Sequence, residues 1–178
     1  VALLAPKGVL SGVKSSADLG RYPLTRKQAI ATILDFAPHD AIFCATTGRA
    51  SRELSNLRDE RGESHSFDYL NVGSMGHASS VALGIALAKP ERRVVCLDGD
   101  AAAIMHLGAL TMPSVVDAPN LLHVVLNNGA HESVGGQPSA GWAVDFTQVA
   151  RACGYATLDG PVSDAQQLAD AVQRLRET

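Results

Sequence analysis

Polar turns that contain glycine follow two apolar segments of the sequence, and together their side chains could bind a metal ion. Gly99-Asp100 follows the first segment, and Asn127-Asn128 follows the second. In an open α/β sheet, ligands bind outside the carboxyl ends of the strands, so both turns should face the same edge. Mg²⁺ takes about six oxygen ligands and is usually held by one or two protein groups and phosphate oxygens. We therefore expect the Asp100 carboxylate, the Asn128 amide oxygen and the Ala130 carbonyl to bind Mg²⁺.

A helix is expected directly after Gly99, and its first residues are small enough for an anion to approach. The backbone N–H groups of Asp100, Ala101 and Ala102 suit a diphosphate oxygen, because the N-terminus of a helix attracts anions. Taken alone, Asp-Gly-Asp and Asn-Asn-Gly are common turns that more often bind nothing. Both turns follow apolar strands, however, and Asp100 lies 28 residues before Asn128. This joint spacing indicates a magnesium–diphosphate site.

Two further turns lie between an expected strand and an expected helix. Thr46-Thr47-Gly48 could bind the far end of a diphosphate through its hydroxyl and N–H groups, although such a turn is equally typical of a simple helix cap. The segment Asn71–Ala78 contains Gly73, Ser74 and Met75. Taken alone, Met75 would more simply fill a gap in the core. Next to a magnesium–diphosphate site, both turns become candidate cofactor contacts.

These motifs resemble those of the thiamine diphosphate (ThDP)-dependent decarboxylases. Gly99-Asp100-Ala101 with Asn127-Asn128 is similar to their Gly-Asp-Gly…Asn-Asn signature, although Ala101 replaces the third glycine. The resemblance implies that Asp100, Asn128 and the Ala130 carbonyl hold Mg²⁺. Asn71–Ala78 resembles the Gly-x-Met-Gly loop of the family, which implies that Met75 supports the bent cofactor and that the Gly73 carbonyl accepts a hydrogen bond from it. The carbanion chemistry then belongs to the cofactor.

The sequence is most similar to the phosphonopyruvate decarboxylase family, and the sulfopyruvate decarboxylases are next closest. The resemblance covers most of residues 24–178 and rests on Ala45–Leu54, Val72–Ser79 and Asn127–Pro138. It implies decarboxylation of 3-phosphonopyruvate, a small 2-keto acid, to phosphonoacetaldehyde and CO₂. Such an anion needs cationic or N–H groups around it. His131 is the first candidate for substrate contact or proton transfer, and His77 is the second.

The same resemblance implies that a glutamate from a separate pyrimidine-binding domain activates the cofactor. None of the glutamates of this chain lies in a context that resembles that domain: Glu53, Glu60, Glu63, Glu91, Glu132 and Glu177. We therefore expect this chain alone to be inactive. It should pair with a pyrimidine-binding domain or subunit, within a homo- or hetero-oligomer, and bind ThDP at the interface.

Short apolar segments alternate with helical ones along the chain, which predicts a three-layer α/β/α fold with a mainly parallel sheet of five or six strands. Strands are expected at residues 41–45, 67–71, 93–97, 121–127 and 155–158, and helices near 49–58, 76–88 and 101–110. Capping boxes at Thr25–Gln28 and Ser163–Gln166 predict the starts of two more helices. Residues 1–24 are rich in Gly, Pro and Ser and lack an initiator Met, so they are interpreted as a linker or the end of a preceding domain. Residues 25–178 form the expected ThDP-binding domain.

Composition limits the classes of partner. The chain has 178 residues, of which 46% are hydrophobic, enough to build one core. Its net charge of −3 gives no reason to expect nucleic acid or an anionic membrane as a partner. No apolar run approaches the roughly 20 residues needed to span a bilayer. The three cysteines are widely spaced in apolar runs, which is typical of buried thiols in a reducing compartment, so we expect a cytoplasmic protein.

Two other classes of function remain open. Val94–Asp100 resembles the Asp-x-Asp loop of haloacid-dehalogenase-type phosphatases, in which Asp98 would attack phosphorus and Asp100 would act as an acid. That loop normally opens its domain and requires a later lysine, whereas no lysine follows Lys89 here. The second alternative is a non-catalytic module that binds a nucleotide or ThDP, which would fit the alanine at position 101 and the lack of an activating glutamate.

Overall fold

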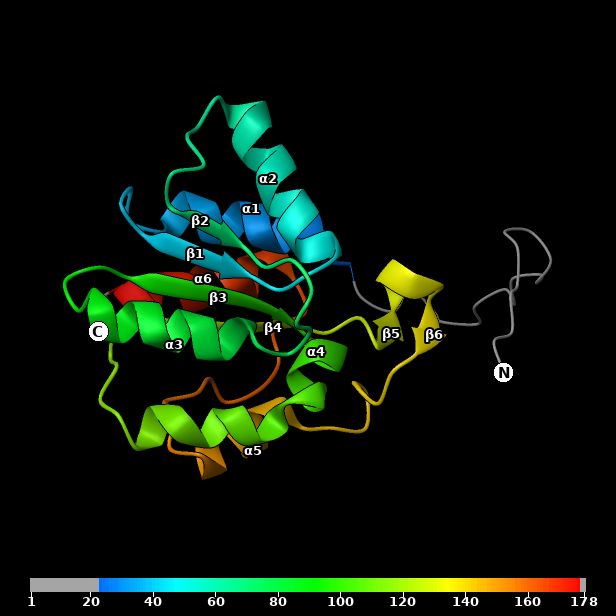
Figure 1. The fold of residues 1–178 in the computed structure, drawn as a ribbon. Coiled ribbons are helices and arrows are strands. Elements are labelled where there is room, and N and C mark those ends of the chain that lie inside the picture. The colour runs from blue at the N-terminus through cyan, green and yellow to red at the C-terminus, as the bar shows by residue number, and fades with distance from the viewer. Residues whose placement is uncertain (1–22, 177–178) are drawn as a thin grey trace, which may run out of the picture.

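A four-stranded parallel sheet with helices on both faces forms the centre of the molecule (Figure 1). The computed structural model describes residues 23–176, so nearly all of the expected linker at residues 1–24 lies outside the described residues. The strand order is β2-β1-β3-β4. The strands are β1 (Ile42–Ala45), β2 (Asp68–Leu70), β3 (Val94–Gly99) and β4 (Leu121–Leu126). The carboxyl ends of all four strands therefore lie at one edge.

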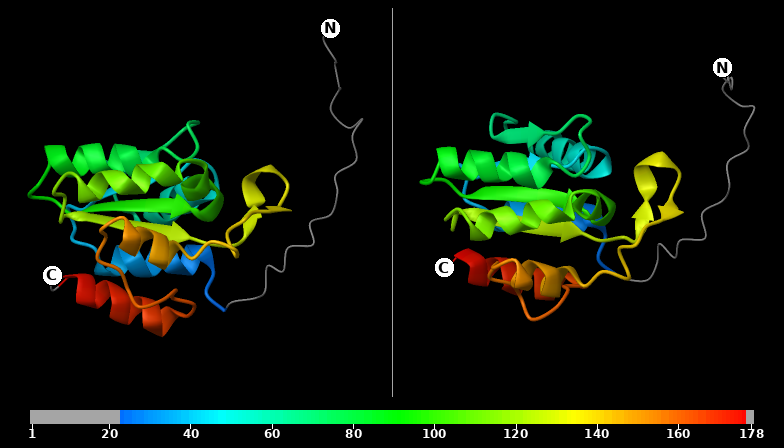
Figure 2. Two further views of the ribbon diagram at one scale, coloured as in Figure 1. Left: turned by 90° about the horizontal axis from the view of Figure 1, so that it is seen from below. Right: turned by 60° about the horizontal axis from the view of Figure 1, so that its bottom comes forward.

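The helices form the two outer layers, as the views in Figure 2 show. They are α1 (Arg26–Phe36), α2 (Arg49–Arg61), α3 (Ala78–Ala88), α4 (Asp100–Met105), α5 (Phe146–Ala152) and α6 (Ala165–Arg176). Two 3₁₀ helices, η1 (Leu107–Ser114) and η2 (Glu132–Val134), and a short hairpin of β5 (Ala130–His131) and β6 (Gln137–Pro138) complete the described elements. Helices α1, α2 and α6 share a core with one face of the sheet, and α3 covers the other.

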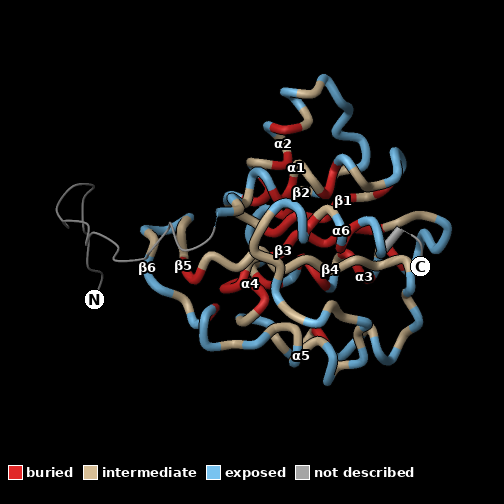
Figure 3. Tube along the Cα trace, turned by 180° about the vertical axis from the view of Figure 1, so that it is seen from behind, coloured by how far each residue is buried: buried red, intermediate tan, exposed pale blue. Residues whose placement is uncertain are grey.

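The side chains of β3 alternate between the two cores. Val95 and Leu97 pack with α1, α2 and α6, whereas Val94 and Cys96 pack with the alanines of α3. Because both faces are covered, β1 and β3 are almost wholly apolar and buried, as Figure 3 shows. Each fully buried aliphatic side chain of this kind contributes about 1.5–3 kcal/mol of transfer free energy. The central strands are therefore the rigid support for the turns at their ends.

The predicted three-layer parallel fold is confirmed, but the expected strand count of five or six is too high, since the described sheet has four. The segment Tyr155–Leu158 forms no strand. Its first residue lies just beyond α5 and is tied to the end of that helix, because the Tyr155 N–H donates to the Ala150 carbonyl. The Arg151 side chain then donates hydrogen bonds to the Thr157 hydroxyl and the Leu158 carbonyl. Local hydrogen bonds thus replace the expected strand.

Several helices also differ from expectation. Helix α5 was not predicted, although Asp145 caps it by accepting from the Gln148 N–H at 3.0 Å. The final capping box is shifted by one residue, since Asp164 accepts from the Gln167 N–H at 2.9 Å and α6 begins at Ala165. The helix expected at residues 101–110 changes to 3₁₀ form after Met105. The Thr25–Gln28 capping box is confirmed. Among residues 23–176, no helix combines the length and apolar character that a membrane crossing requires.

Candidate functional site

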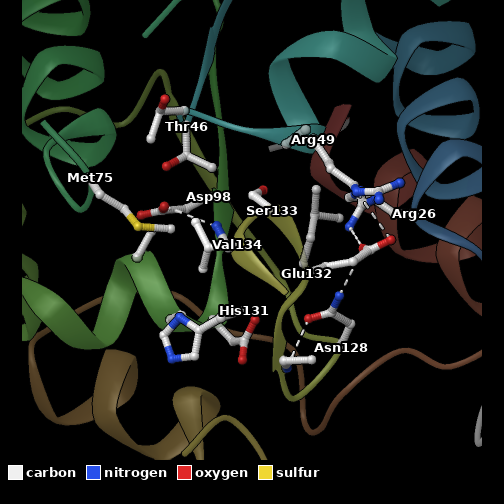
Figure 4. A pocket seen from close by; sticks show the side chains of 18 residues that line it. Arg26, Thr46, Arg49, Met75, Asp98, Asn128, His131, Glu132, Ser133 and Val134 are labelled. Carbon is white, nitrogen blue, oxygen red and sulfur yellow. Dashed lines mark hydrogen bonds and ion pairs between the residues drawn. The ribbon is translucent and has the colours of Figure 1, made fainter. Parts of the chain in front are cut away.

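A pocket of about 60 Å³ lies at the carboxyl ends of β1, β3 and β4 (Figure 4). It brings together ten of the predicted site residues: Thr46, Thr47, Met75, Gly99, Asp100, Ala101, Ala102, Asn128, Ala130 and His131. Gly48, Gly73, Ser74 and His77 do not line it. The turns after three different strands therefore meet, as the alternation of strands and helices predicted.

The end of β1 presents a buried hydroxyl to this pocket. Thr46 is only 4% exposed, and its Oγ1 has no hydrogen-bond partner among the described residues. The residue is fixed in place because its N–H donates to the Leu97 carbonyl at 2.8 Å, while the Ser51 hydroxyl donates to its carbonyl at 2.6 Å. Helix α2 begins next to it after Gly48 (φ +107°), and no side chain caps that start. An unpaired hydroxyl beside uncapped helix N–H groups suits an anion.

The end of β3 contributes a buried carboxylate. Asp100 is 3% exposed and is the first residue of α4, and one of its oxygens accepts a hydrogen bond from the Ser139 hydroxyl. Gly141 lies so close that a side chain there would overlap both Asp100 and Asn127. Asn127 holds this arrangement by donating to the Gly141 carbonyl at 2.8 Å and accepting from the Gly129 N–H at 3.0 Å. Asn127 therefore organises the turn, whereas its neighbour Asn128 lines the pocket.

Asn128 is oriented by hydrogen bonds on both sides of its amide. Its Oδ1 accepts from the Ala130 N–H at 3.1 Å, and its Nδ2 donates to Glu132 Oε2 at 3.2 Å. The same Glu132 oxygen accepts from Arg26 Nη1 at 2.8 Å, and Arg49 Nε lies 3.3 Å from the other oxygen. Figure 4 shows these side chains converging on one rim of the pocket.

The loop that carries Met75 is strained and closely packed. Gly73, Ser74 and Gly76 all have positive φ values, of +74°, +44° and +89°. A side chain at Gly76 would lie 2.7 Å from the Ala102 carbonyl, so only glycine allows the loop to sit against α4. This geometry directs the Met75 side chain into the pocket that Thr46 and Asp98 also line, as Figure 4 shows.

The two candidate histidines differ in position. His131 lines the pocket directly after Ala130. His77 is exposed outside it, where its ring lies 4.0 Å from the ring of His106 and its Nδ1 lies 3.1 Å from the Ser74 carbonyl. A catalytic role of His77 thus finds no support in this geometry.

Several lining residues were not predicted, among them Arg26, Glu132, Ser133 and Val134. Arg26 lies 106 positions before Glu132, so no local pattern could indicate their contact. Asp98, which an Asp-x-Asp phosphatase would use as a nucleophile, is fully buried. Its Oδ1 accepts from the Gly99 N–H at 2.9 Å, and its Oδ2 lies 3.4 Å from His123 Nε2. Burial, reinforced by the Asp98 charge, raises the pKa of the nearby Cys44 thiol to about 12.

Comparison with known proteins identifies the class to which this fold and site belong. Residues 46–178 match the family described as "Thiamine pyrophosphate enzyme, C-terminal TPP binding domain", in which thiamine pyrophosphate is another name for ThDP. The chain belongs to this family. The match excludes the phosphatase interpretation of Asp98 and Asp100, because it places both residues in a different fold family.

Decarboxylases are among the curated relatives of the chain. The chain is 41% identical over 170 residues to a phosphonopyruvate decarboxylase of Streptomyces viridochromogenes, covering 94% of this chain and 41% of that protein. It is 36% identical over 132 residues to the sulfopyruvate decarboxylase subunit beta of Methanothermobacter thermautotrophicus, covering 74% of this chain and 68% of that subunit. The chain therefore spans less than half of the Streptomyces relative but most of the separate subunit.

The fold is also found in a solved structure. The structure of benzoylformate decarboxylase from Polynucleobacter necessarius aligns with a TM-score of 0.73 at 17% sequence identity, covering 94% of this chain and 33% of that protein. At this identity, the likeness supports the fold alone.

Proposed function

We propose that this chain is the diphosphate- and Mg²⁺-binding half of a ThDP-dependent 2-keto acid decarboxylase, with 3-phosphonopyruvate as its substrate. The observation that carries the proposal is the unpaired, buried Thr46 hydroxyl, which shares a pocket with the oxygen ligands on Asp100 and Asn128. A buried polar atom without a partner costs about 1–3 kcal/mol, so its place at this pocket is explained if a ligand supplies the partner.

The donor set fits the expected group. Asp100, Asn128 and the Ala130 carbonyl offer one carboxylate, one amide oxygen and one backbone oxygen, which are hard ligands that suit Mg²⁺. Thr46, Thr47 and the first N–H groups of α2 would bind the diphosphate, with Gly48, Gly99, Ala101 and Ala102 leaving room for it. Met75 would support the bend of the cofactor, next to Ser74 and the Gly73 carbonyl.

Bound ThDP would supply the electron sink for the loss of CO₂, and the residues of this chain would orient the reactants. His131 follows the Ala130 carbonyl directly and lines the same pocket. We assign it to contact with the anionic substrate or to proton transfer. His77, which lies outside the pocket, is a weaker candidate for the same roles.

The size of the pocket supports the need for a partner. Its volume of about 60 Å³ is far below the roughly 300–1,000 Å³ of sites that enclose a drug-sized ligand. This chain alone would therefore hold only the diphosphate end. A pyrimidine-binding domain or subunit would cover the rest and supply the activating glutamate, in a homo- or hetero-oligomer. The relative named as a beta subunit supports a separate partner chain.

The buried cysteines bear on the location of the protein in the cell. Cys44 and Cys96 are paired neighbours on β1 and β3, and both are buried free thiols. Buried free thiols are typical of proteins in a reducing compartment, so we propose a cytoplasmic location.

Reconstitution with the pyrimidine-binding half tests the proposal. CO₂ release should be fastest from phosphonopyruvate, slower from sulfopyruvate and slowest from pyruvate, and the 178-residue chain alone should release none. A preference for sulfopyruvate would favour the alternative assignment as a sulfopyruvate decarboxylase-type subunit. Binding of ThDP without turnover of any 2-keto acid would favour a non-catalytic binding module. CO₂ release by the chain alone would disprove the need for a partner.

A further inference from the structure

Glu132 lies at the centre of a hydrogen-bonded chain that leads from two helices to Asn128. Its Oε2 accepts from Arg26 Nη1 at 2.8 Å and from Asn128 Nδ2 at 3.2 Å. Arg26 is in turn held by Glu53, through Nε at 2.8 Å and Nη2 at 2.7 Å. The chain thus runs from Glu53 on α2, through Arg26 on α1, to Glu132 and Asn128 in the loop after β4. Figure 4 shows the part from Arg26 to Asn128.

A carboxylate can only accept hydrogen bonds, and this fixes the direction of the Asn128 amide. The NH₂ group must face Glu132, so the oxygen must lie on the opposite side, where it accepts from the Ala130 N–H. An amide oxygen has two lone pairs, and the second remains for a cation. If the amide turned over, its NH₂ group would face the cation and its oxygen would face Glu132.

We propose that Glu132 is a positioning residue that fixes the Asn128 amide with its oxygen toward the metal. This inference rests on the proposed role of Asn128 as a metal ligand. Outer partners of this kind orient metal ligands, and their loss typically weakens metal affinity by about 10- to 100-fold.

The charges around Glu132 support positioning rather than direct binding of the cation. One oxygen of Glu132 is shared by Arg26 and Asn128, and the other lies against Arg49. Burial lowers the pKa of the Arg26 guanidinium, but the hydrogen bonds and charges of Glu53 and Glu132 outweigh this and raise it. Arg26 therefore stays charged and neutralises Glu132. A carboxylate that is already paired in this way is a poor competitor for Mg²⁺.

Glu132→Gln and Glu132→Ala separate a positioning role of Glu132 from direct binding of the metal and from an effect of its charge alone. In E132Q, the side-chain oxygen can keep the place of Oε2 and accept from Asn128 and Arg26, while the NH₂ group turns toward the half-exposed Arg49. In E132A, the Asn128 NH₂ group loses its acceptor, and of the two described hydrogen bonds of the amide only the one from the Ala130 N–H, at 3.1 Å, remains. Glu91→Ala is the matched control, because Glu91 is an exposed glutamate that does not line the pocket.

The measurement is the affinity for Mn²⁺, used in place of Mg²⁺, in the intact enzyme with its pyrimidine-binding half and saturating ThDP. Electron paramagnetic resonance reports free Mn²⁺ directly, and thermal melting reports whether each variant is folded. We expect E132A to bind Mn²⁺ about 10- to 100-fold more weakly, and E132Q and E91A to bind like the wild type.

Equal affinity of folded E132A and the wild type would overturn the inference, and so would equal weakening in E132Q and E132A, which would indicate a ligand or a charge effect. If E132A fails to fold, E132Q still tests the inference, because weakened Mn²⁺ affinity of folded E132Q would contradict orientation by hydrogen bonding. A wild-type enzyme that binds no Mn²⁺ would instead refute the proposed function.

Discussion

Replacing Thr46 with valine should stabilise the ligand-free chain and weaken cofactor binding at the same time. The hydroxyl is buried without a partner among the described residues, and valine has nearly the same shape. An unsatisfied buried group costs about 1–3 kcal/mol, so its removal should raise the free energy of unfolding by that amount. For a chain of this size, each kcal/mol corresponds to about 2–4 °C in Tm.

Cofactor binding should change in the opposite direction. A hydrogen bond to a charged group contributes about 1.5–3 kcal/mol. Loss of one such bond to a diphosphate oxygen therefore weakens ThDP affinity on the order of 10- to 100-fold. Denaturant unfolding of the chain without ligand measures the first effect, and calorimetric titration of the intact enzyme with ThDP and Mg²⁺ measures the second.

Thr46→Ser is the matched control, because it keeps the hydroxyl and should keep ThDP affinity close to that of the wild type. The reasoning fails if T46V lowers the stability of the ligand-free chain, or if T46V binds ThDP as tightly as the wild type.

Two further predictions concern the packing around the site and the buried ionisable groups. Gly76→Ala should weaken ThDP binding and destabilise the chain more than Gly62→Ala does. A side chain at Gly76 meets the Ala102 carbonyl, whereas Gly62, which also has a positive φ, has open space around it. Equal effects of the two substitutions on unfolding and on ThDP binding would contradict this. Burial raises the pKa of Cys44 from 9.0 to about 12 and that of Tyr155 from 10.0 to about 12. Both folded-state pKa values exceed the unfolded ones, so the contribution to stability is complete below pH 9 and is lost as the pH rises toward 12. The loss is roughly 1.4 kcal/mol per pH unit for the fully buried Cys44 and less for the half-buried Tyr155, whose charge is partly screened by solvent. Urea unfolding at pH 8, 9, 10 and 11 checks this, and a free energy of unfolding that stays constant or rises would refute it.

The sequence predicted the features that depend on local patterns. The apolar runs before Gly99 and Asn127 mark β3 and β4, since strands covered on both faces must be uniformly apolar. The parallel arrangement then brings Asp100 and Asn128 to one pocket, although they lie 28 residues apart. The Thr25 capping box is likewise a local hydrogen-bond pattern, and it forms as predicted.

What the sequence could not show depends on partners far along the chain or on competing local contacts. The contact between Arg26 and Glu132 joins residues 106 positions apart, and the motifs in which they lie do not indicate that the two side chains meet. Residues 155–158 were expected to form a strand, but the Tyr155 N–H donates to the end of α5, and the Arg151 side chain donates to Thr157 and Leu158. His77 follows the Met75 loop in sequence, yet the positive φ of Gly76 turns the chain so that its ring packs on His106.

Binding of ThDP to the intact enzyme, compared between the wild type and Asp100→Asn, tests the proposed site most directly. Asparagine keeps the shape of Asp100 and can still accept from the Ser139 hydroxyl, so the fold should be retained. It removes the negative charge that a divalent ion requires. We predict that the wild type binds ThDP only with Mg²⁺ or Mn²⁺ present, and that D100N loses this metal-dependent binding while its melting temperature stays the same. Tight binding of ThDP by D100N, or binding by the wild type that does not depend on a divalent ion, would contradict the proposed magnesium–diphosphate site.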